Sequence, residues 1–333
     1  NISSADLIFI GSGISTSFTL LPLLDELKSN SKSKNPITIA IIEENEELFT
    51  GLAYGKRSGS TALLITSLAD FLPVGSERNS FIKWLSNNKK SLLKEFDEDG
   101  GDLSKNWMKT HKEEITANKW EDIYIPRRFF GVYIKDKVET AIQDFQKSNQ
   151  LTVNHIKDEA IAIKKVNDVF NIQLNNNTQP LQSKRVVLSV GIPPKRNLWT
   201  HEEVRQFEHS CCLINNPYSL SLPDNLDKIE KLLNSKTTLS NILIIGSNAS
   251  AMEMIYKLND RNKIKQKLGN INVISPQGEL PNSAQDEFTR STVFVPKNLL
   301  TPDPPMFKLD KFSPGCIIVN PAIVVFGWNV LVE

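Results

Sequence analysis

Two turns rich in small residues are the first candidates for chemistry, because each follows an apolar run of strand length. The first turn consists of Gly11, Ser12, Gly13, Ile14, Ser15 and Thr16. Gly11 allows a tight turn, and Gly13 lacks the Cβ that would keep a pyrophosphate from the positive end of the next helix. Thr16 stands where glycine or alanine is usual. The pattern predicts a dinucleotide site, with a structural β-to-α turn as the alternative.

An acid at the end of the next predicted strand supports this prediction. The strand ITIAIIEE, residues 37–44, ends in Glu43 and Glu44. Glu43 stands where an acid accepts hydrogen bonds from an adenosine ribose, and Glu44 is the alternative. The polar loop 28–36 accounts for a spacing longer than the usual one of about 20 residues.

The second turn has the same setting near residue 246. It consists of Gly246, Ser247, Asn248, Ala249, Ser250 and Ala251. Asn248 replaces the middle glycine, and we expect a left-handed backbone there, with altered or weakened nucleotide binding. The following strand, 271–275, ends in Ser275 without an acid or arginine for a ribose. A second nucleotide site and a structural relic both remain open.

The elements around these turns predict an α/β fold with parallel strand–turn–helix units. Residues 18–27 form a helix with Pro22 in its early turns, residues 51–130 form an insertion, and a helix-like segment follows Arg127 and Arg128. Short strands fill 151–190, and one helix covers Leu226–Leu233. We expect two domains, 1–200 and 201–333, the second smaller and irregular at its C-terminal end.

Composition excludes several classes of function. A net charge of +1 over 333 residues, with scattered lysines and arginines, argues against nucleic-acid binding. Three cysteines favour a reducing cytoplasm, and the adjacent Cys211 and Cys212 suit two buried thiols better than a redox pair. With His201 and His209 they match no metal-ligand spacing. The uncharged stretch 312–332 predicts two buried strands rather than a membrane anchor.

Three further groups have open roles. Arg127 and Arg128 suit a phosphate or carboxylate as well as a surface pair at a helix start. Tyr54 and Trp84 suit the core better than a flavin-stacking role. Glu253 points either to a nucleotide or to solvent.

The ordered motifs resemble a known family. The series GSGIS, IIEE, GLAYG, ALLITSLADF, FIKWL, IPRRFFGVYI, VVLSVG, IIGSNASAMEMI and VISPQGELP is similar to FAD–NAD(P)-binding proteins related to the two-dinucleotide-binding-domain flavoprotein oxidoreductases. The resemblance implies an FAD-type Rossmann domain with a β-meander and an insertion, plus a smaller NAD(P)-type Rossmann-like domain. It places FAD on the first turn and NAD(P)H on the second. It also implies that Gly51 to Gly55 and Gly191 approach the flavin and that Val153 lines the adenine.

The chain departs from that pattern at several positions. Ala62 and Ile65 replace the family's histidine and asparagine, Pro276 replaces an arginine that would bind a 2′-phosphate, and no late Gly-Asp motif follows. The sequence predicts an FAD-dependent oxidoreductase in which NAD(P)H reduces the flavin and electrons pass to oxygen or a small substrate. The alternatives are a regulatory or scaffold protein that binds nucleotides without turnover, and a dehydrogenase with NAD alone. The sequence specifies neither the substrate, nor NADH against NADPH, nor the oligomeric state.

Overall fold

The computed structural model describes residues 2–29, 36–147, 150–191, 202, 212–218, 221–275, 278 and 316–318. The chain divides into two compact units. The first contains Asn1–Asp227 and Pro314–Glu333, and the second contains Lys228–Ser313. The boundary predicted from the sequence is at residue 200, with the whole C-terminal segment in the second domain.

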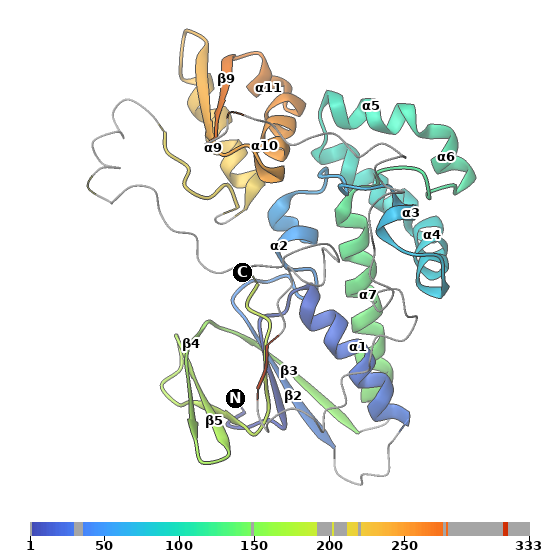
Figure 1. The fold of residues 1–333 in the computed structure, drawn as a ribbon, viewed down its shortest axis with the longest axis vertical. Coiled ribbons are helices and arrows are strands. Elements are labelled where there is room, and N and C mark those ends of the chain that lie inside the picture. Colours follow the sequence, from blue (N-terminus) through green and yellow to red (C-terminus); the bar gives the residue numbers. More distant parts are fainter. Residues whose placement is uncertain are drawn as a thin grey trace. The chain divides into compact units, whose positions relative to one another are not determined.

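The first unit is built on a parallel sheet of five strands (Figure 1). Their order is β10 (Cys316–Ile318), β7 (Val186–Leu188), β1 (Leu7–Ile10), β2 (Ile37–Glu43) and β3 (Leu151–Lys157). All neighbouring pairs are parallel. The predicted α/β fold with parallel strands is therefore confirmed. One predicted C-terminal strand exists as β10, and it joins the sheet of the first unit; the rest of 312–332 lies outside the described residues.

Alternating side chains bury both faces of this sheet. Phe9, Ile39 and Ile41 belong to one core cluster, which also contains buried residues of the helices. Ile8 and Ile42 belong to a second cluster, which contains residues of the antiparallel sheet described next. Successive strand residues point to opposite faces, so both faces need an apolar cover. The covering helices are α1 (Ile14–Ser29) and α7 (Arg127–Gln146).

A three-stranded antiparallel sheet covers the other face and confirms the predicted meander. Its strands are β4 (Ala160–Val166), β5 (Val169–Leu174) and β6 (Leu181–Ser183). Asp158 fixes its loops, because its carboxylate accepts the N–H groups of Glu159 at 2.8 Å and Asn176 at 3.1 Å. The side-chain amides of Asn176 and Asn177 donate to it as well, each at 2.9 Å. Burial by itself would raise the pKa of Asp158, but these donors outweigh burial and hold the pKa below its usual value.

Helix α1 differs from its prediction. It begins at Ile14, so Pro22 lies in the middle of the helix rather than in its early turns. Proline removes one N–H donor and leaves the carbonyl four residues earlier, at Phe18, without its helical partner. Phe18 is 40% exposed, so water can reach this part of the helix.

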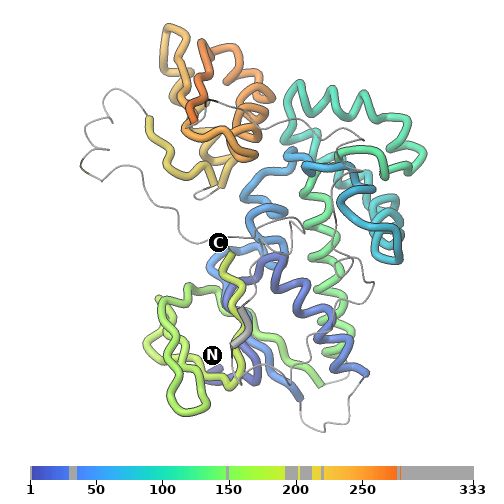
Figure 2. Tube along the Cα trace, in the orientation of Figure 1, coloured from blue at the N-terminus to red at the C-terminus, as the bar shows by residue number. Residues whose placement is uncertain are grey.

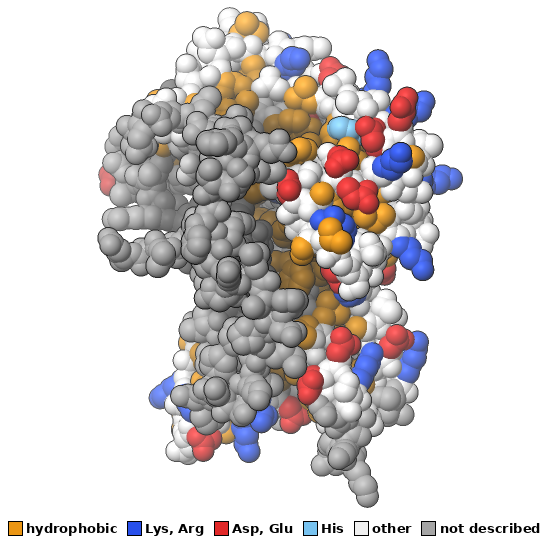
Figure 3. Space-filling model, turned by 45° about the vertical axis from the view of Figure 1, so that its right-hand side comes forward, with side chains coloured by type: hydrophobic (Ala, Val, Ile, Leu, Met, Phe, Trp, Pro, Cys, Tyr) orange, Lys and Arg blue, Asp and Glu red, His pale blue; other side chains and the backbone are white. Residues whose placement is uncertain are grey.

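The predicted insertion is helical. It contains α2 (Gly51–Tyr54), η1 (Lys56–Ser58), α3 (Leu68–Phe71), α4 (Ser76–Asp99), α5 (Asp102–Thr110) and α6 (Lys112–Ala117). Aromatic rings join these helices to α7, as where Phe81 meets Phe130 edge-on with centroids 5.4 Å apart. Figure 2 follows this part of the chain from blue through cyan to green. In the part of the chain that the structure describes, acidic and basic side chains are interspersed on the face shown in Figure 3.

The second unit repeats the strand–turn–helix pattern. Its elements are β8 (Ser240–Ile245), α10 (Ala249–Asp260), α11 (Asn262–Lys265) and β9 (Leu268–Ile274), and the two strands pair in parallel. Helix α9 (Leu222–Asn234) precedes them and contains the predicted helix Leu226–Leu233. No helix within the described ranges is long and apolar enough to cross a membrane.

Candidate functional site

The first turn has the geometry that its glycines predict. Strand β1 ends at Ile10 and α1 begins at Ile14, so Gly11, Ser12 and Gly13 form the whole connection. Gly11 has φ +91°, and a Cβ at this position would meet the carbonyl oxygen of Ser189. The Thr16 hydroxyl donates to the Gly11 carbonyl at 2.6 Å. Thr16, the residue that departs from the usual pattern, therefore helps to close the turn.

The start of α1 can bind an anion. The first N–H groups of a helix have no acceptor inside it, and the helix dipole is positive at this end. No acidic residue occupies the first turn of α1. Ser15 is only 2% exposed, and its hydroxyl has no hydrogen-bond partner in the described part of the structure. These residues fit the pyrophosphate of a dinucleotide, which accepts hydrogen bonds and carries negative charge.

Glu43 lies beside this turn, as predicted, and its carboxylate is already well supplied with donors. One oxygen accepts the Ser12 N–H at 2.9 Å and the Ser12 hydroxyl at 3.1 Å. The other accepts the Asn45 N–H at 3.0 Å and its amide at 2.7 Å. A carboxylate accepts about four hydrogen bonds. A ribose contact to Glu43 therefore requires one of these donors to move. Glu44, the alternative ribose ligand, is exposed.

The segment Phe49–Gly51 lies directly against the first turn. The Phe49 N–H donates to the Ser12 carbonyl at 2.6 Å, and the Phe49 carbonyl accepts the Ser17 hydroxyl at 2.8 Å. Phe49 is buried with φ +70°, an unfavourable conformation for a bulky residue. A Cβ at Gly51 would be 3.2 Å from the Gly13 Cα. The structure thus brings Gly51 and Gly13 together, two residues that the resemblance implied to lie near one cofactor.

Two more predicted residues lie in or shortly after strands of the same sheet. Gly191 comes shortly after β7 and has φ +73°. Val153 lies on β3, opposite Ile39 of β2, and is half-buried. The Ser189 hydroxyl is buried and has no hydrogen-bond partner in the described residues, a feature that the sequence did not indicate.

Tyr54 belongs to the core, as the sequence favoured. The centroid of its ring is 5.5 Å from that of Phe130 and 6.4 Å from that of Phe71, and the residue is 4% exposed. Burial raises the pKa of Tyr54 to about 12, although the Arg127 guanidinium opposes the rise. Arg127 is half-buried at the start of α7, and its N–H donates to the Ala62 carbonyl at 2.8 Å. Trp84 is partly buried against the same core cluster, and its Nε1 donates to Asp136 at 2.7 Å.

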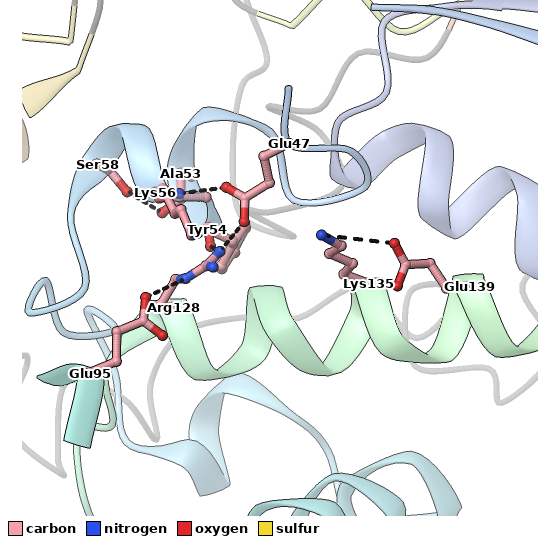
Figure 4. Close-up of polar contacts among 10 residues, drawn as sticks. Glu47, Ala53, Tyr54, Lys56, Ser58, Glu95, Arg128, Lys135 and Glu139 are labelled. Carbon is pink, nitrogen blue, oxygen red and sulfur yellow. Dashed lines mark hydrogen bonds and ion pairs between the residues drawn. The ribbon is translucent and has the colours of Figure 1, made fainter. Parts of the chain in front are cut away.

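Arg128 forms the network in Figure 4, which the sequence did not predict. Its Nη1 is 2.5 Å from an oxygen of Glu47, and its Nε is 3.3 Å from an oxygen of Glu95. The other Glu47 oxygen accepts the Lys56 N–H at 2.6 Å. Of the two roles considered for Arg128, the structure favours binding carboxylates, and the carboxylates belong to the chain itself. No local pattern marks Glu47, because its partner is 81 residues away.

The second turn corrects one prediction. Gly246 has φ +105° and starts the turn, whereas Asn248 has φ −75° and ψ −174°, which is extended rather than left-handed. The left-handed backbone conformation of this turn occurs at Gly246, so Asn248 does not have to adopt it. Asn248 is the N-cap of α10, and its side chain makes no capping bond. Ser247 is half-buried, Asn248, Ala249 and Ser250 are exposed, and Ala251 is buried.

The remaining candidates that lie within the described residues form no further site. Cys212 is a free, half-buried thiol, and Cys211 lies outside the described residues. Pro276 is also outside them. Glu253 is half-buried on α10. Within the described residues, no group of three histidine, cysteine, aspartate or glutamate side chains could hold a metal ion.

A family model described as FAD-NAD(P)-binding matches residues 8–193, more than half of the chain. The matched range contains the first turn, the insertion and the meander. The chain belongs to the FAD-NAD(P)-binding family. The family's description names FAD and NAD(P), the two cofactors that the resemblance implied, and the resemblance itself is confirmed.

Relatives of this family member occur in mycobacteria. An uncharacterised protein of Mycobacterium tuberculosis and another of Mycobacterium bovis are each 29% identical to it over 286 residues. The match covers 83% of this chain and 52% of each relative. The chain thus spans about half the length of the curated relatives that it matches.

Two of the solved structures that resemble this chain illustrate the low identity of these matches. A bacillithiol disulfide reductase of Staphylococcus aureus is 12% identical, with a TM-score of 0.43, over 87% of this chain and 62% of that protein. An oxidised steroid monooxygenase bound to NADP is 12% identical, with a TM-score of 0.38, over 86% of this chain and 42% of that protein. Neither likeness identifies a reaction for this FAD-NAD(P)-binding chain.

Proposed function

We propose that this chain is a flavin-dependent oxidoreductase in which NAD(P)H reduces FAD and electrons pass to oxygen or a small substrate. The proposal rests on family membership together with one observation, the start of α1. There, a glycine turn, a helix end without acids and the unpartnered Ser15 hydroxyl suit a pyrophosphate. When bound, FAD supplies the redox chemistry, since it accepts a hydride from NAD(P)H and passes on two electrons.

The chain's own residues bind and orient the cofactors in this proposal. Backbone N–H groups at the start of α1 and the Ser15 hydroxyl donate to the pyrophosphate. Glu43 or Glu44 accepts hydrogen bonds from the ribose, and Val153 lines the adenine. The backbone at Gly51 and Gly191 approaches the flavin, because neither residue has a side chain to prevent it. Arg127 stabilises a phosphate, and the turn Gly246–Ala251 binds NAD(P)H.

A regulatory or scaffold protein that binds nucleotides without turnover is the second candidate. Asn248 favours it, because an exposed side chain stands where a dinucleotide phosphate comes closest to the backbone. Such a protein would retain FAD or NAD(P)H and would not consume NAD(P)H.

One experiment separates these candidates. A visible absorbance spectrum of the purified protein, reconstituted with FAD, is followed by addition of NADH and then NADPH. An oxidised-flavin band with steady NAD(P)H consumption supports the oxidoreductase. A flavin band without consumption supports the regulatory protein, and bound NAD without flavin supports a dehydrogenase with NAD alone.

Ser15→Ala tests the site itself. A buried hydroxyl without a partner costs about 1–3 kcal/mol, so its removal should leave the cofactor-free protein at least as stable. If the hydroxyl donates to FAD, the same change should weaken FAD binding. Thr19→Ala, one helical turn later, is the control, because the Thr19 hydroxyl donates to the Ser15 carbonyl at 2.8 Å. Unchanged FAD affinity in Ser15→Ala would remove Ser15 from the site.

A cytoplasmic location is part of the proposal. Cys212 is a free thiol, and reducing compartments keep thiols in this state. Fractionation of cells that express the tagged chain checks it, and recovery in a secreted fraction would contradict it.

A further inference from the structure

Arg128, on α7, contacts three groups that are far from it in the sequence. Glu47 lies in the loop between β2 and α2, Glu95 lies on α4, and the Tyr54 carbonyl at the end of α2 is 3.5 Å from the Arg128 Nη1. In Figure 4 the guanidinium lies between the two carboxylates, at the beginning of α7. Arg128 is 5% exposed, so its charge depends on these partners.

The stability of α7 does not explain this arrangement. Arg128 is the second residue of α7, where the positive end of the helix dipole disfavours a cation. Breaking a buried ion pair is costly, whereas replacing the whole pair with apolar residues is often neutral. A buried arginine between two carboxylates is thus weak evidence for stability. Its effect on the positions of the segments that it joins is the better explanation.

Glu47 transmits that effect to the first turn. Its two oxygens bind the Arg128 Nη1 and the Lys56 N–H, which fixes the loop on both sides. Two residues later, Phe49 has its unfavourable φ and bonds to Ser12 and Ser17. A strained residue persists only when its surroundings hold it in place. The Arg128–Glu47 pair is one of the contacts that hold the loop containing Phe49. Glu95 lies on α4, outside this loop.

We propose that Arg128 acts through Glu47 as a positioning residue, which holds Phe49–Gly51 against the first turn so that the site is formed before FAD arrives. This inference rests on the proposed function. It assigns to Arg128 the preorganisation of the FAD site, and it separates the Glu47 contact from the Glu95 contact.

The test compares Glu47→Gln with Glu95→Ala, since each variant removes one of the two carboxylates from Arg128. In Glu47→Gln, the glutamine offers one acceptor to two donors, so either Arg128 or Lys56 faces an NH₂ group. FAD affinity should fall about tenfold in Glu47→Gln and stay within about twofold in Glu95→Ala. Arg128→Lys retains the charge but loses the forked geometry. Its FAD affinity should therefore lie between those of wild type and Glu47→Gln. Affinity is measured by titrating cofactor-free protein with FAD, and its melting temperature is measured without FAD.

The outcomes separate positioning from stability. If melting temperatures fall alike in Glu47→Gln and Glu95→Ala but only Glu47→Gln loses affinity, the positioning role is supported. If both variants lose affinity to the same degree, or if Glu47→Gln binds FAD as the wild type does, Arg128 is only structural and the inference is wrong. If the wild-type chain itself binds no FAD, the proposed function fails and the inference fails with it.

Discussion

Replacing Gly11 by alanine tests whether the first turn depends on close packing between two backbone segments. Gly11 has φ +91°, and a left-handed backbone costs an L-residue about 1–2 kcal/mol. The new Cβ would also meet the Ser189 carbonyl oxygen. Ser189 cannot retreat freely, because its N–H is bonded to the Ile10 carbonyl at 2.8 Å. Overpacking costs about 1–3 kcal/mol, so Gly11→Ala should lower the free energy of unfolding by about 2–5 kcal/mol.

Gly191→Ala is the matched control in the same unit. Gly191 has φ +73°, but among the described residues, apart from its two chain neighbours, no atom lies within 4 Å of a Cβ built there. Only the backbone cost of about 1–2 kcal/mol should therefore appear. Urea unfolding of the cofactor-free proteins is followed by tryptophan fluorescence, because Trp84, Trp107 and Trp120 lie in the first unit. Equal losses in the two variants would refute the packing argument.

Three further predictions follow from ionisation and from the second turn. The raised pKa of Tyr54 favours its neutral form in the folded state, so its contribution to stability is complete below pH of about 10 and disappears as pH rises toward about 12. Melting temperatures across this window should fall less in Tyr54→Phe than in wild type, and parallel curves would contradict the assignment. For Asp158 the pH dependence is reversed. Its lowered pKa favours the ionised carboxylate in the folded state, so its contribution to stability is present above about pH 4 and is lost as the pH falls further. The difference in melting temperature between wild type and Asp158→Asn should therefore shrink below pH 4 or so, and a constant difference would argue against a charged Asp158. Asn248→Gly should change stability by only a few tenths of a kcal/mol, because Asn248 caps α10 without a side-chain bond. NAD(P)H should bind this variant as well as wild type or better, and a loss of binding would show that the Asn248 side chain contacts the nucleotide.

Much of the local architecture could be predicted from the sequence. The apolar run before Gly11 and the acid at Glu43 identify a strand, a turn and the end of the next strand, because these signals depend on neighbouring residues. The same holds for the meander and for the helix that follows Arg127. The location of Glu43 beside the turn also follows, since adjacent parallel strands end at the same edge of a sheet.

Backbone conformation at single residues was less predictable. Asn248 tolerates a left-handed conformation in general, yet the actual turn takes that step at Gly246. Proline usually avoids the middle of a helix, yet α1 continues through Pro22. In both cases a residue preference was overridden by the path of the surrounding chain.

Short-range periodicity and turn residues were enough to locate the two glycine turns and to indicate which segments are strands or helices. The pairing of Cys316–Ile318 with β7 and the contacts of Arg128 with Glu47 and Glu95 became visible only in the folded chain. These contacts join residues far apart in the chain. They depend on which elements pack side by side, and a charged residue carries no local sign of the partner that it will bind.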